Sequence, residues 1–261
     1  MTVETHVRRA RSQVRAERDA VDAKLRAFET FLDRVADVPA EPTTSPSRMT
    51  ATSGPLSRGE PSTDDRCRVV RRAFAETIRP HSVADVGDDE SLLATVRHEF
   101  SDSVAVALAP TTETPFSPDL KRAVLSRAKA RRTETEVLGR ALDREEAVLD
   151  DAGAAVDEIT AWVADADETP LTDLGFAALR RRHETLAGHR DRCSELARTR
   201  QGFLRDTTNR GVDVGVRHRS LVSYLYGGFP VDYPLLSTVV RLDDVCATCQ
   251  RAVRSHLVRR A

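Results

Sequence analysis

The stretch that decides the fold is VETHVRRARSQVRAERDAVDAKLRAFETFLDRVAD, residues 3–37. Apolar side chains recur in it every seven residues, with charged residues between them. The repeating residues are Val7, Val14, Val21, Phe28 and Val35, and Ala10, Leu25, Phe31 and Leu32 fill the intermediate positions. Such a repeat keeps apolar side chains on one stripe of a helix, as in a coiled coil. It predicts a single helix, about 50 Å long at a rise of about 1.5 Å per residue.

The composition agrees with long, solvated helices. Aromatic residues make up 5% of the 261 residues and charged residues 31%, which leaves little material for a thick globular interior. Basic and acidic residues number 40 and 41, so the chain has no strong field with which to attract a nucleic acid or an anionic membrane. Nucleic-acid binding is therefore disfavoured.

The sequence also lacks the apolar segments that membrane insertion or secretion requires. Its longest candidate is VAVALA at 104–109, far below the roughly 18 residues of a membrane span. The charged N-terminal stretch has no apolar core of the kind found in secretory signals. We expect a soluble, cytoplasmic protein with no membrane partner, whose four cysteines stay reduced or bind a metal.

Proline, glycine, serine and threonine divide the chain into five segments. They are a long N-terminal helix (1–38), a flexible linker (39–61), a unit of short helices (62–116), a long helical hairpin (117–208), and an aromatic turn region with a C-terminal helix (209–261). Residues 39–61 contain hardly any large apolar side chain, so burial cannot offset the entropy of ordering them. We therefore expect this linker to be flexible.

The longest helix is predicted over 117–166, because Ser117 and Pro118 form an N-cap and a first-turn proline. Two more long helices are predicted over 172–206 and 235–260. Since only a short turn joins the first two, they should pack antiparallel. The predicted fold class is all-α, with long antiparallel helices forming an elongated bundle or coiled coil beside a small unit of short helices.

The helix predicted over 117–166 carries a glutamate on its apolar face. Glu145 interrupts an alternating four- and three-residue spacing of apolar side chains, so we expect it to pair with an arginine of another helix. The other carboxylates of REEAVLDDAGAAVDE, residues 144–158, are expected to form a solvated face. All three tyrosines lie near Phe229 and should close the end of the bundle with their hydroxyl groups in solvent. They are Tyr224, Tyr226 and Tyr233.

Three stretches carry a family resemblance. They are RRAFAETIRPHS (71–82), FSPDLKRAVLSRAKARR (116–132) and YLYGGFPVDYPLLSTVVRL (224–242). Their order and spacing resemble a family of uncharacterised haloarchaeal proteins, described only as a domain of unknown function. The resemblance covers most of the chain outside the linker and implies long helices. It implies no catalytic or binding residue.

The motif CATC, residues 246–249, is the clearest candidate site. Cys246 and Cys249 fall on the apolar face of their predicted helix, and Cys67 and Cys193 fall on those of theirs, so buried thiols that pack in the core are favoured. The alternative is a zinc site. Cys193 and His189 stand one turn apart and could complete a Cys3His set with Cys246 and Cys249 if their helices are neighbours. Redox chemistry is disfavoured, because no basic group or helix N-terminus is positioned to lower a thiol pKa.

No catalytic motif survives inspection. HETLAGH, residues 183–189, matches only the start of the HExxH motif of zinc proteases, because Ala187 stands where the second histidine should be. Arginine clusters at 8–11, 179–182 and 251–260 could contact nucleic acid, but acids lie near each of them, and pairing within the protein is the commoner role.

We therefore expect a non-catalytic helical interaction or scaffold protein that binds a protein partner or itself, with no cofactor and no small-molecule substrate. One alternative is a metal- or thiol-responsive regulator that uses Cys193, Cys246 and Cys249. A second is a nucleic-acid-binding accessory protein.

Overall fold

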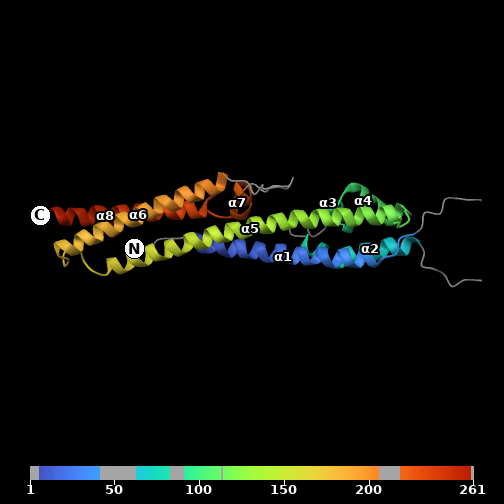
Figure 1. Ribbon diagram of the computed structural model, residues 1–261, viewed down its shortest axis with the longest axis horizontal. Helices are drawn as coiled ribbons and strands as arrows, with labels where there is room; N and C mark the ends of the chain where they lie inside the picture. The colour runs from blue at the N-terminus through green and yellow to red at the C-terminus, as the bar shows by residue number, and fades with distance from the viewer. Residues whose placement is uncertain (1–5, 42–62, 83–90, 113, 206–217, 260–261) are drawn as a thin grey trace, which may run out of the picture. The chain divides into compact units, whose positions relative to one another are not determined.

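The computed structural model describes residues 6–41, 63–82, 91–112, 114–205 and 218–259. These residues are 84% helical and contain no strand, so the all-α prediction is confirmed (Figure 1). The α-helices are α1 (Val7–Asp37), α2 (Thr63–Glu76), α3 (Leu92–Glu99), α4 (Asp102–Ala107), α5 (Pro118–Asp167), α6 (Phe176–Arg205), α7 (His218–Tyr226) and α8 (Pro234–Val258). Short 3-10 turns occur at Arg79–His81 (η1) and Pro110–Thr112 (η3).

The long helices lie close to their predicted limits. The start of α5 forms as expected, since the Ser117 hydroxyl accepts a hydrogen bond from the Leu120 amide at 3.2 Å and Pro118 is the first helical residue. Apart from residues 39–41, the linker predicted over 39–61 lies outside the described residues. None of the described helices combines the length and apolar character that crossing a membrane requires.

Packing divides the chain into two compact units. The first unit comprises Met1–Arg18 and Gly139–Ala261, and the second comprises Asp19–Leu138. Helices α1 and α5 therefore each contribute one part to each unit. The five segments expected from the sequence follow helix ends instead, and they stay a prediction.

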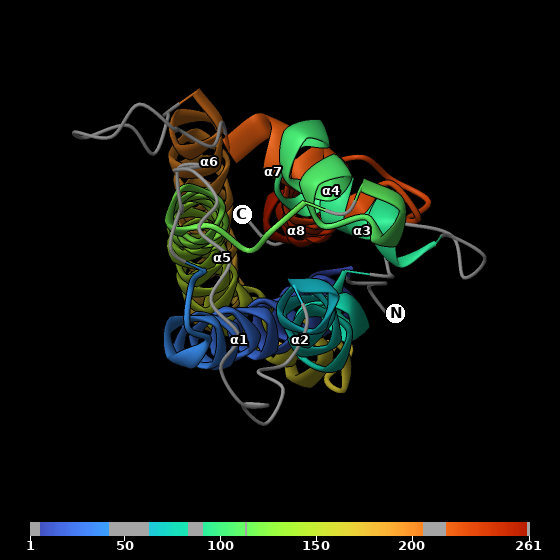
Figure 2. The ribbon, with the colours of Figure 1, turned by 90° about the vertical axis from the view of Figure 1, so that its right-hand side faces the viewer.

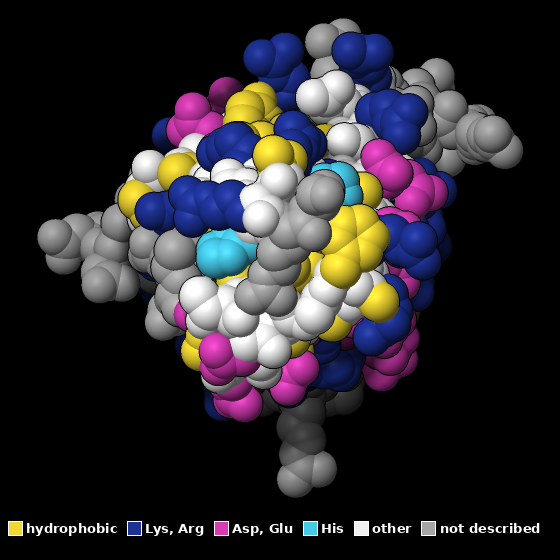
Figure 3. All heavy atoms as spheres, turned by 90° about the vertical axis from the view of Figure 1, so that its left-hand side faces the viewer, with side chains coloured by type: hydrophobic (Ala, Val, Ile, Leu, Met, Phe, Trp, Pro, Cys, Tyr) yellow, Lys and Arg dark blue, Asp and Glu magenta, His cyan; other side chains and the backbone are white. Residues whose placement is uncertain are grey.

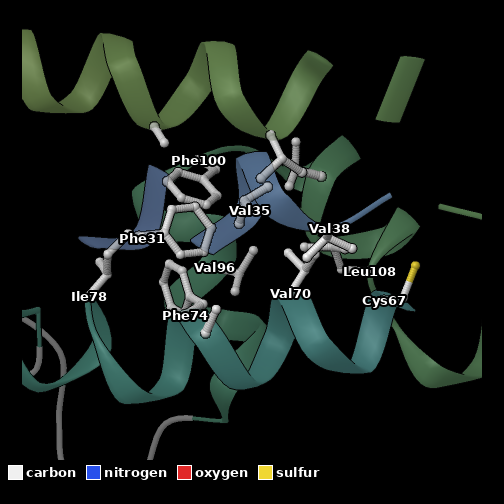
Figure 4. Packing of buried hydrophobic residues seen from close by; sticks show 14 of the residues in the cluster. Phe31, Val35, Val38, Cys67, Val70, Phe74, Ile78, Val96, Phe100 and Leu108 are labelled. Carbon is white, nitrogen blue, oxygen red and sulfur yellow. The ribbon is translucent and has the colours of Figure 1, made fainter. Parts of the chain in front are cut away.

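The core of the second unit is an apolar cluster that joins α1, α2, α3, α4 and the start of α5. Its centre holds Phe31, Phe74 and Phe100, whose ring centroids lie 5.4 to 6.0 Å apart (Figure 4). Figure 2 shows α2 and α5 on different sides of α1 in this unit. Two of the three ring pairs meet edge to face, and rings in this arrangement attract one another beyond their burial alone.

A buried carboxylate lies in the same unit. Glu99, at the end of α3, is 1% exposed, and its carboxylate lies 2.7 Å from Lys24 Nζ of α1 and 3.2 Å from Arg131 Nη2 of α5. Burial by itself would raise the Glu99 pKa, but Lys24, Ser82 and Arg131 outweigh it, and the pKa is lowered. Glu99 therefore stays ionised and ties three helices together.

In the first unit, α1 and α5 are joined by a ladder of ion pairs. It comprises Arg8 with Asp157 (3.1 Å), Arg11 with Asp150 (2.5 Å), Arg15 with Glu146 (2.8 Å), and Arg18 with Asp143. Residue numbers rise along α1 as they fall along α5, so the helices are antiparallel. The expectation of a purely solvated face over 144–158 is wrong in this respect, because arginines spaced three and four residues apart on α1 face it. Each of these partly exposed pairs adds little to stability by itself.

Gly153 of α5 lies directly against α1 at this ladder. A Cβ at this position would stand 3.4 Å from both Val7 Cγ1 and Arg11 Nη1, whereas a Cβ at Gly188 of α6 would meet no atom within 4 Å. The close approach of α1 and α5 therefore leaves room for a methyl group at Gly153 and for nothing larger.

We expect Gly153→Leu to lower the unfolding free energy by about 1–3 kcal/mol, because the side chain would overfill the α1–α5 contact. Gly153→Ala should be neutral or stabilising by up to about 1 kcal/mol, since alanine favours helix and its methyl fits. Urea unfolding followed by circular dichroism measures both. The matched control is Gly188→Leu, which has free space and should not destabilise. Equal stability of the two leucine variants would contradict the close packing at Gly153.

Candidate functional site

Helices α6 and α8 run antiparallel through the first unit. Arg190 Nε of α6 lies 3.0 Å from Asp243 Oδ1 of α8, and Gln250 Nε2 of α8 donates to the His183 carbonyl oxygen of α6 at 3.4 Å. The buried positions of α6 repeat every seven residues and are Leu179, Leu186, Cys193 and Arg200. The contact between these helices brings two of the four cysteines together.

The structure corrects the expected apolar face of α8 at one position. Leu235, Val239, Leu242, Cys246 and Val253 are buried as expected. Cys249 is only half-buried, and Gln250 takes the buried position four residues after Cys246. A polar side chain is tolerated there because the Gln250 amide bonds to both Arg190 and the His183 carbonyl. The expectation that both thiols of CATC face the core therefore holds for Cys246 alone.

The thiols are held in their neutral form. Burial raises the pKa of Cys193 to about 11 and that of Cys246 to about 12, and the neighbouring thiols Cys193 and Cys249 add to the effect at Cys246. Burial also raises the Cys249 pKa. A thiolate is a far better nucleophile than a thiol, so these raised pKa values disfavour redox chemistry at the three cysteines near neutral pH.

His189 contacts α5 through its ring. The centroids of the His189 and Trp162 rings lie 4.9 Å apart, and His189 Nε2 is buried without a hydrogen-bond partner. Burial lowers the His189 pKa, and nearby Glu158 opposes this only in part. Within the ranges that the structure describes, no group of three or more His, Cys, Asp and Glu side chains is arranged to hold a metal ion. This arrangement adds no support to the zinc hypothesis for Cys193, His189, Cys246 and Cys249, which stays a prediction.

Among the described residues of the first unit, Glu145 of α5 is the most deeply buried charged group. Arg200 of α6 binds it with two parallel hydrogen bonds of 2.7 and 2.8 Å, and the Tyr226 hydroxyl of α7 donates to Glu145 Oε1 at 2.7 Å. The three residues are at most 2% exposed. The expected pairing of Glu145 with an arginine is thus confirmed. With its oxygens bonded and shielded from solvent, this carboxylate joins three helices and has no access to a substrate.

The prediction that the tyrosine hydroxyl groups lie in solvent is wrong for Tyr226. Its hydroxyl group is buried against Glu145 instead of lying in solvent, because a buried carboxylate needs donors that water cannot supply there. Burial and the adjacent Glu145 charge raise the Tyr226 pKa, so the phenol remains a donor. Tyr224 is 61% exposed, as expected for a ring at the end of a bundle.

Ring contacts continue from this cluster toward the surface. Tyr226 packs on Phe229 with ring centroids 5.2 Å apart, and the Arg9 guanidinium of α1 lies 4.4 Å from the Phe229 ring centroid. Stacked side chains thus connect Arg9 of α1 to Tyr226 of α7, which bonds to Glu145 of α5. Arg9, one of the clustered N-terminal arginines, therefore has a partner within the chain.

Arg200 is the important residue that the sequence analysis missed. A signal was present, because Leu179, Leu186 and Cys193 are spaced by seven residues and the next position in that repeat is Arg200. An arginine on an apolar stripe, in a chain with a glutamate on another stripe, indicates a buried ion pair.

A cleft of about 210 Å³ opens at the far end of α5 in the first unit. Its walls come from α5, the turn after it, α6 and α8, and most are apolar: Trp162, Pro170, Leu171, Leu186, Ala252 and Val253. Asp167, Arg182 and Cys249 also line it. We call it the α5–α8 cleft. Figure 3 faces this end of the unit, where hydrophobic side chains are exposed among charged ones.

Comparison with known proteins gives one match. Residues 5–250 match a protein family described as a domain of unknown function, DUF7260. No curated protein matches the chain, and no solved structure does either. The match spans most of the chain, and its description names no activity.

We expect Tyr226→Phe to lower the unfolding free energy by about 1.5–3 kcal/mol, because it removes a hydrogen bond to a buried charged group and keeps the ring. Urea unfolding at neutral pH measures the change. The matched control is Tyr224→Phe on the same helix, whose ring is mostly exposed and which should change stability by less than about 0.5 kcal/mol. Equal effects of the two variants would show that the Tyr226 hydroxyl contributes nothing.

The half-buried His189, whose Nε2 atom is shielded from solvent, predicts a loss of stability in acid. Because burial lowers its pKa in the folded state, the unfolded chain binds the proton more readily, with a pKa of about 6.5. The free energy of unfolding therefore keeps its full value above about pH 6.5. It decreases as the pH falls through that value toward the folded pKa of His189. In His189→Phe, which keeps an aromatic contact to Trp162, the unfolding free energy should fall less steeply between about pH 7 and 5 than in the wild type. Identical slopes would contradict a lowered His189 pKa in the folded state.

Proposed function

We propose that this chain, which belongs to the DUF7260 family, is a non-catalytic helical interaction protein that binds a protein partner, or itself, through the α5–α8 cleft. The observation that carries the proposal is the cleft itself, an apolar hollow that remains open at the end of the first unit. Exposed apolar surface of this kind is typical of interaction sites.

The size of the cleft favours a protein side chain as its occupant. Small-molecule sites usually measure about 300–1,000 Å³, and this cleft is smaller. A large apolar side chain from a partner would fit between Trp162 and Val253 and exclude water from both.

Two further apolar side chains lie at the same end of the unit. Phe176, the first residue of α6, is 51% exposed, and Val258, the last residue of α8, is 72% exposed. Gln250 bonds to His183 across the two helices. Val258 follows Gln250 by eight residues and Phe176 precedes His183 by seven, so the antiparallel helices bring their ends to one level. Phe176 and Val258 thus add exposed apolar surface at the same level of the unit.

The alternatives receive less support from these contacts. A metal- or thiol-responsive regulator using Cys193, Cys246 and Cys249 would need accessible thiolates, and burial raises all three pKa values. Nucleic-acid binding would need free basic groups, and in the cluster at 8–11 Arg8 and Arg11 pair with acids of α5. We also propose that the long helices pack as a coiled coil and that the protein is haloarchaeal and cytoplasmic.

Photocrosslinking tests the proposed function. A photoreactive residue at Ala252, which is exposed at the cleft, should crosslink to protein in the native cell. The same residue at Ala154, an exposed position of α5 outside the cleft, is the matched control and should give no such product. The mass of the product identifies the partner, and twice the mass of the chain indicates a second copy. Absence of any product specific to Ala252 would contradict the proposed function.

A further inference from the structure

We infer that the α5–α8 cleft binds the C-terminal residue of a partner protein. A large apolar side chain of that residue fills the hollow, and its carboxylate binds Arg182. This inference rests on the proposed function and makes it more specific, because it states which part of the partner enters the cleft. The observation that carries it is the bonding of Arg182, whose partner is a neutral carbonyl group and not a carboxylate.

Arg182 differs in this respect from the other arginines of the first unit that are shielded from solvent. Among the described residues of this unit, every other arginine that is buried or half-buried forms an ion pair with a carboxylate. These pairs are Arg11 with Asp150, Arg18 with Asp143, Arg190 with Asp243, and Arg200 with Glu145. Half-buried Arg182 instead donates from Nη1 to the Thr169 carbonyl oxygen at 3.2 Å.

The contact with Thr169 leaves the charge of Arg182 to be balanced. A guanidinium carries several N–H donors, and a carboxylate can accept a parallel pair of them, whereas a carbonyl oxygen brings no net charge. Asp167 also lines the cleft, but it is exposed to solvent and engaged in an interaction of its own. An occupant of the cleft would remove water from Arg182, and a carboxylate on that occupant would offset the cost.

The apolar part of the cleft suits a large side chain. Leu186 and Val253 line it and are each only 1% exposed, so the hollow reaches side chains of the core. Trp162, which is half-buried, adds an aromatic surface. An apolar ring or branched side chain in this position would be withdrawn from water by core residues, while Arg182 stays within its reach.

A C-terminal residue combines the apolar group and the carboxylate at the required spacing. Both are attached to the same Cα, so both can reach a hollow of about 210 Å³ that Arg182 itself lines. An acidic side chain next to an apolar one in an extended segment would point to the opposite side, away from Arg182. Capture of a C-terminal carboxylate is a recurring mode of peptide recognition. We therefore assign the carboxylate to the end of the partner's chain.

Peptide binding to the intact chain tests this inference. Trp162 is the one tryptophan of the sequence and lines the cleft, so its fluorescence reports occupancy. The probe is acetyl-glycyl-phenylalanine, which ends in a phenyl ring and a free carboxylate and should change the emission in a saturable way. Its C-terminal amide should bind at least about tenfold more weakly, because it lacks the charge that pairs with Arg182. Acetyl-phenylalanyl-glycine, whose carboxylate lies one residue beyond the ring, should also bind more weakly than the probe.

A substitution at Arg182 provides the second arm of the test. Arg182→Gln should weaken binding of the acid peptide at least about tenfold and leave binding of the amide unchanged, because only the acid uses the guanidinium charge. The matched control is Arg181→Gln, which changes an exposed neighbour outside the cleft and should leave the affinity for both peptides unchanged. Circular dichroism verifies that each variant keeps its helical content.

Any of four results would overturn the inference. The acid peptide leaves the Trp162 emission unchanged up to its solubility limit, the amide binds as tightly as the acid or more tightly, acetyl-phenylalanyl-glycine binds as tightly as the probe, or Arg182→Gln retains the wild-type affinity for the acid. If one of them occurs while the residue at Ala252 still crosslinks to a protein, the inference fails and the proposed function stands. If that crosslink is absent as well, both fail.

Discussion

The first unit depends on one buried charge. Glu145 lies midway along the 50 residues of α5, out of contact with water, and its oxygens are bonded to Arg200 of α6 and Tyr226 of α7. An unpaired carboxylate in such a place costs several kcal/mol, so any arrangement that moves Arg200 away from it is strongly disfavoured. This sets the register of α5 against α6. The register of α8 against α6 is set by two further contacts, Arg190 with Asp243 and Gln250 with the His183 carbonyl. These contacts hold α5, α6 and α8 in place, and side chains of the three helices line the cleft.

The second unit uses the same device with different partners. Glu99 is held by Lys24 and Arg131, from two further helices, beside a cluster of phenylalanine rings. Rows of valine, leucine and alanine pack acceptably in several registers, because such side chains have similar sizes and no directional bonds. A buried carboxylate with a required partner accepts one register only. We interpret the two glutamates as selecting a single packing in each unit, a role known for buried polar groups in helical assemblies.

Many charged side chains of the described residues form ion pairs with one another. The chain has 40 basic and 41 acidic residues, and in the first unit many of them stand in pairs between α1 and α5. Each such pair stabilises the fold only slightly. A shift of α1 along α5 by one helical turn is nevertheless disfavoured, because it would disrupt every pair of the ladder.

The sequence by itself determined the helical character of the chain, the limits of its long helices and the buried face of α1, because these follow from periodic apolar spacing and local caps such as Ser117 and Pro118. It also indicated that Glu145 requires an arginine. Only the tertiary structure decided which arginine, and that Tyr226 adds a second donor. It also decided that Gln250 replaces Cys249 in the core and that acids of 144–158 pair with α1. The reason is physical: the spacing along one helix defines which side chains share a face, whereas the partner of that face depends on which helix packs against it and in which register.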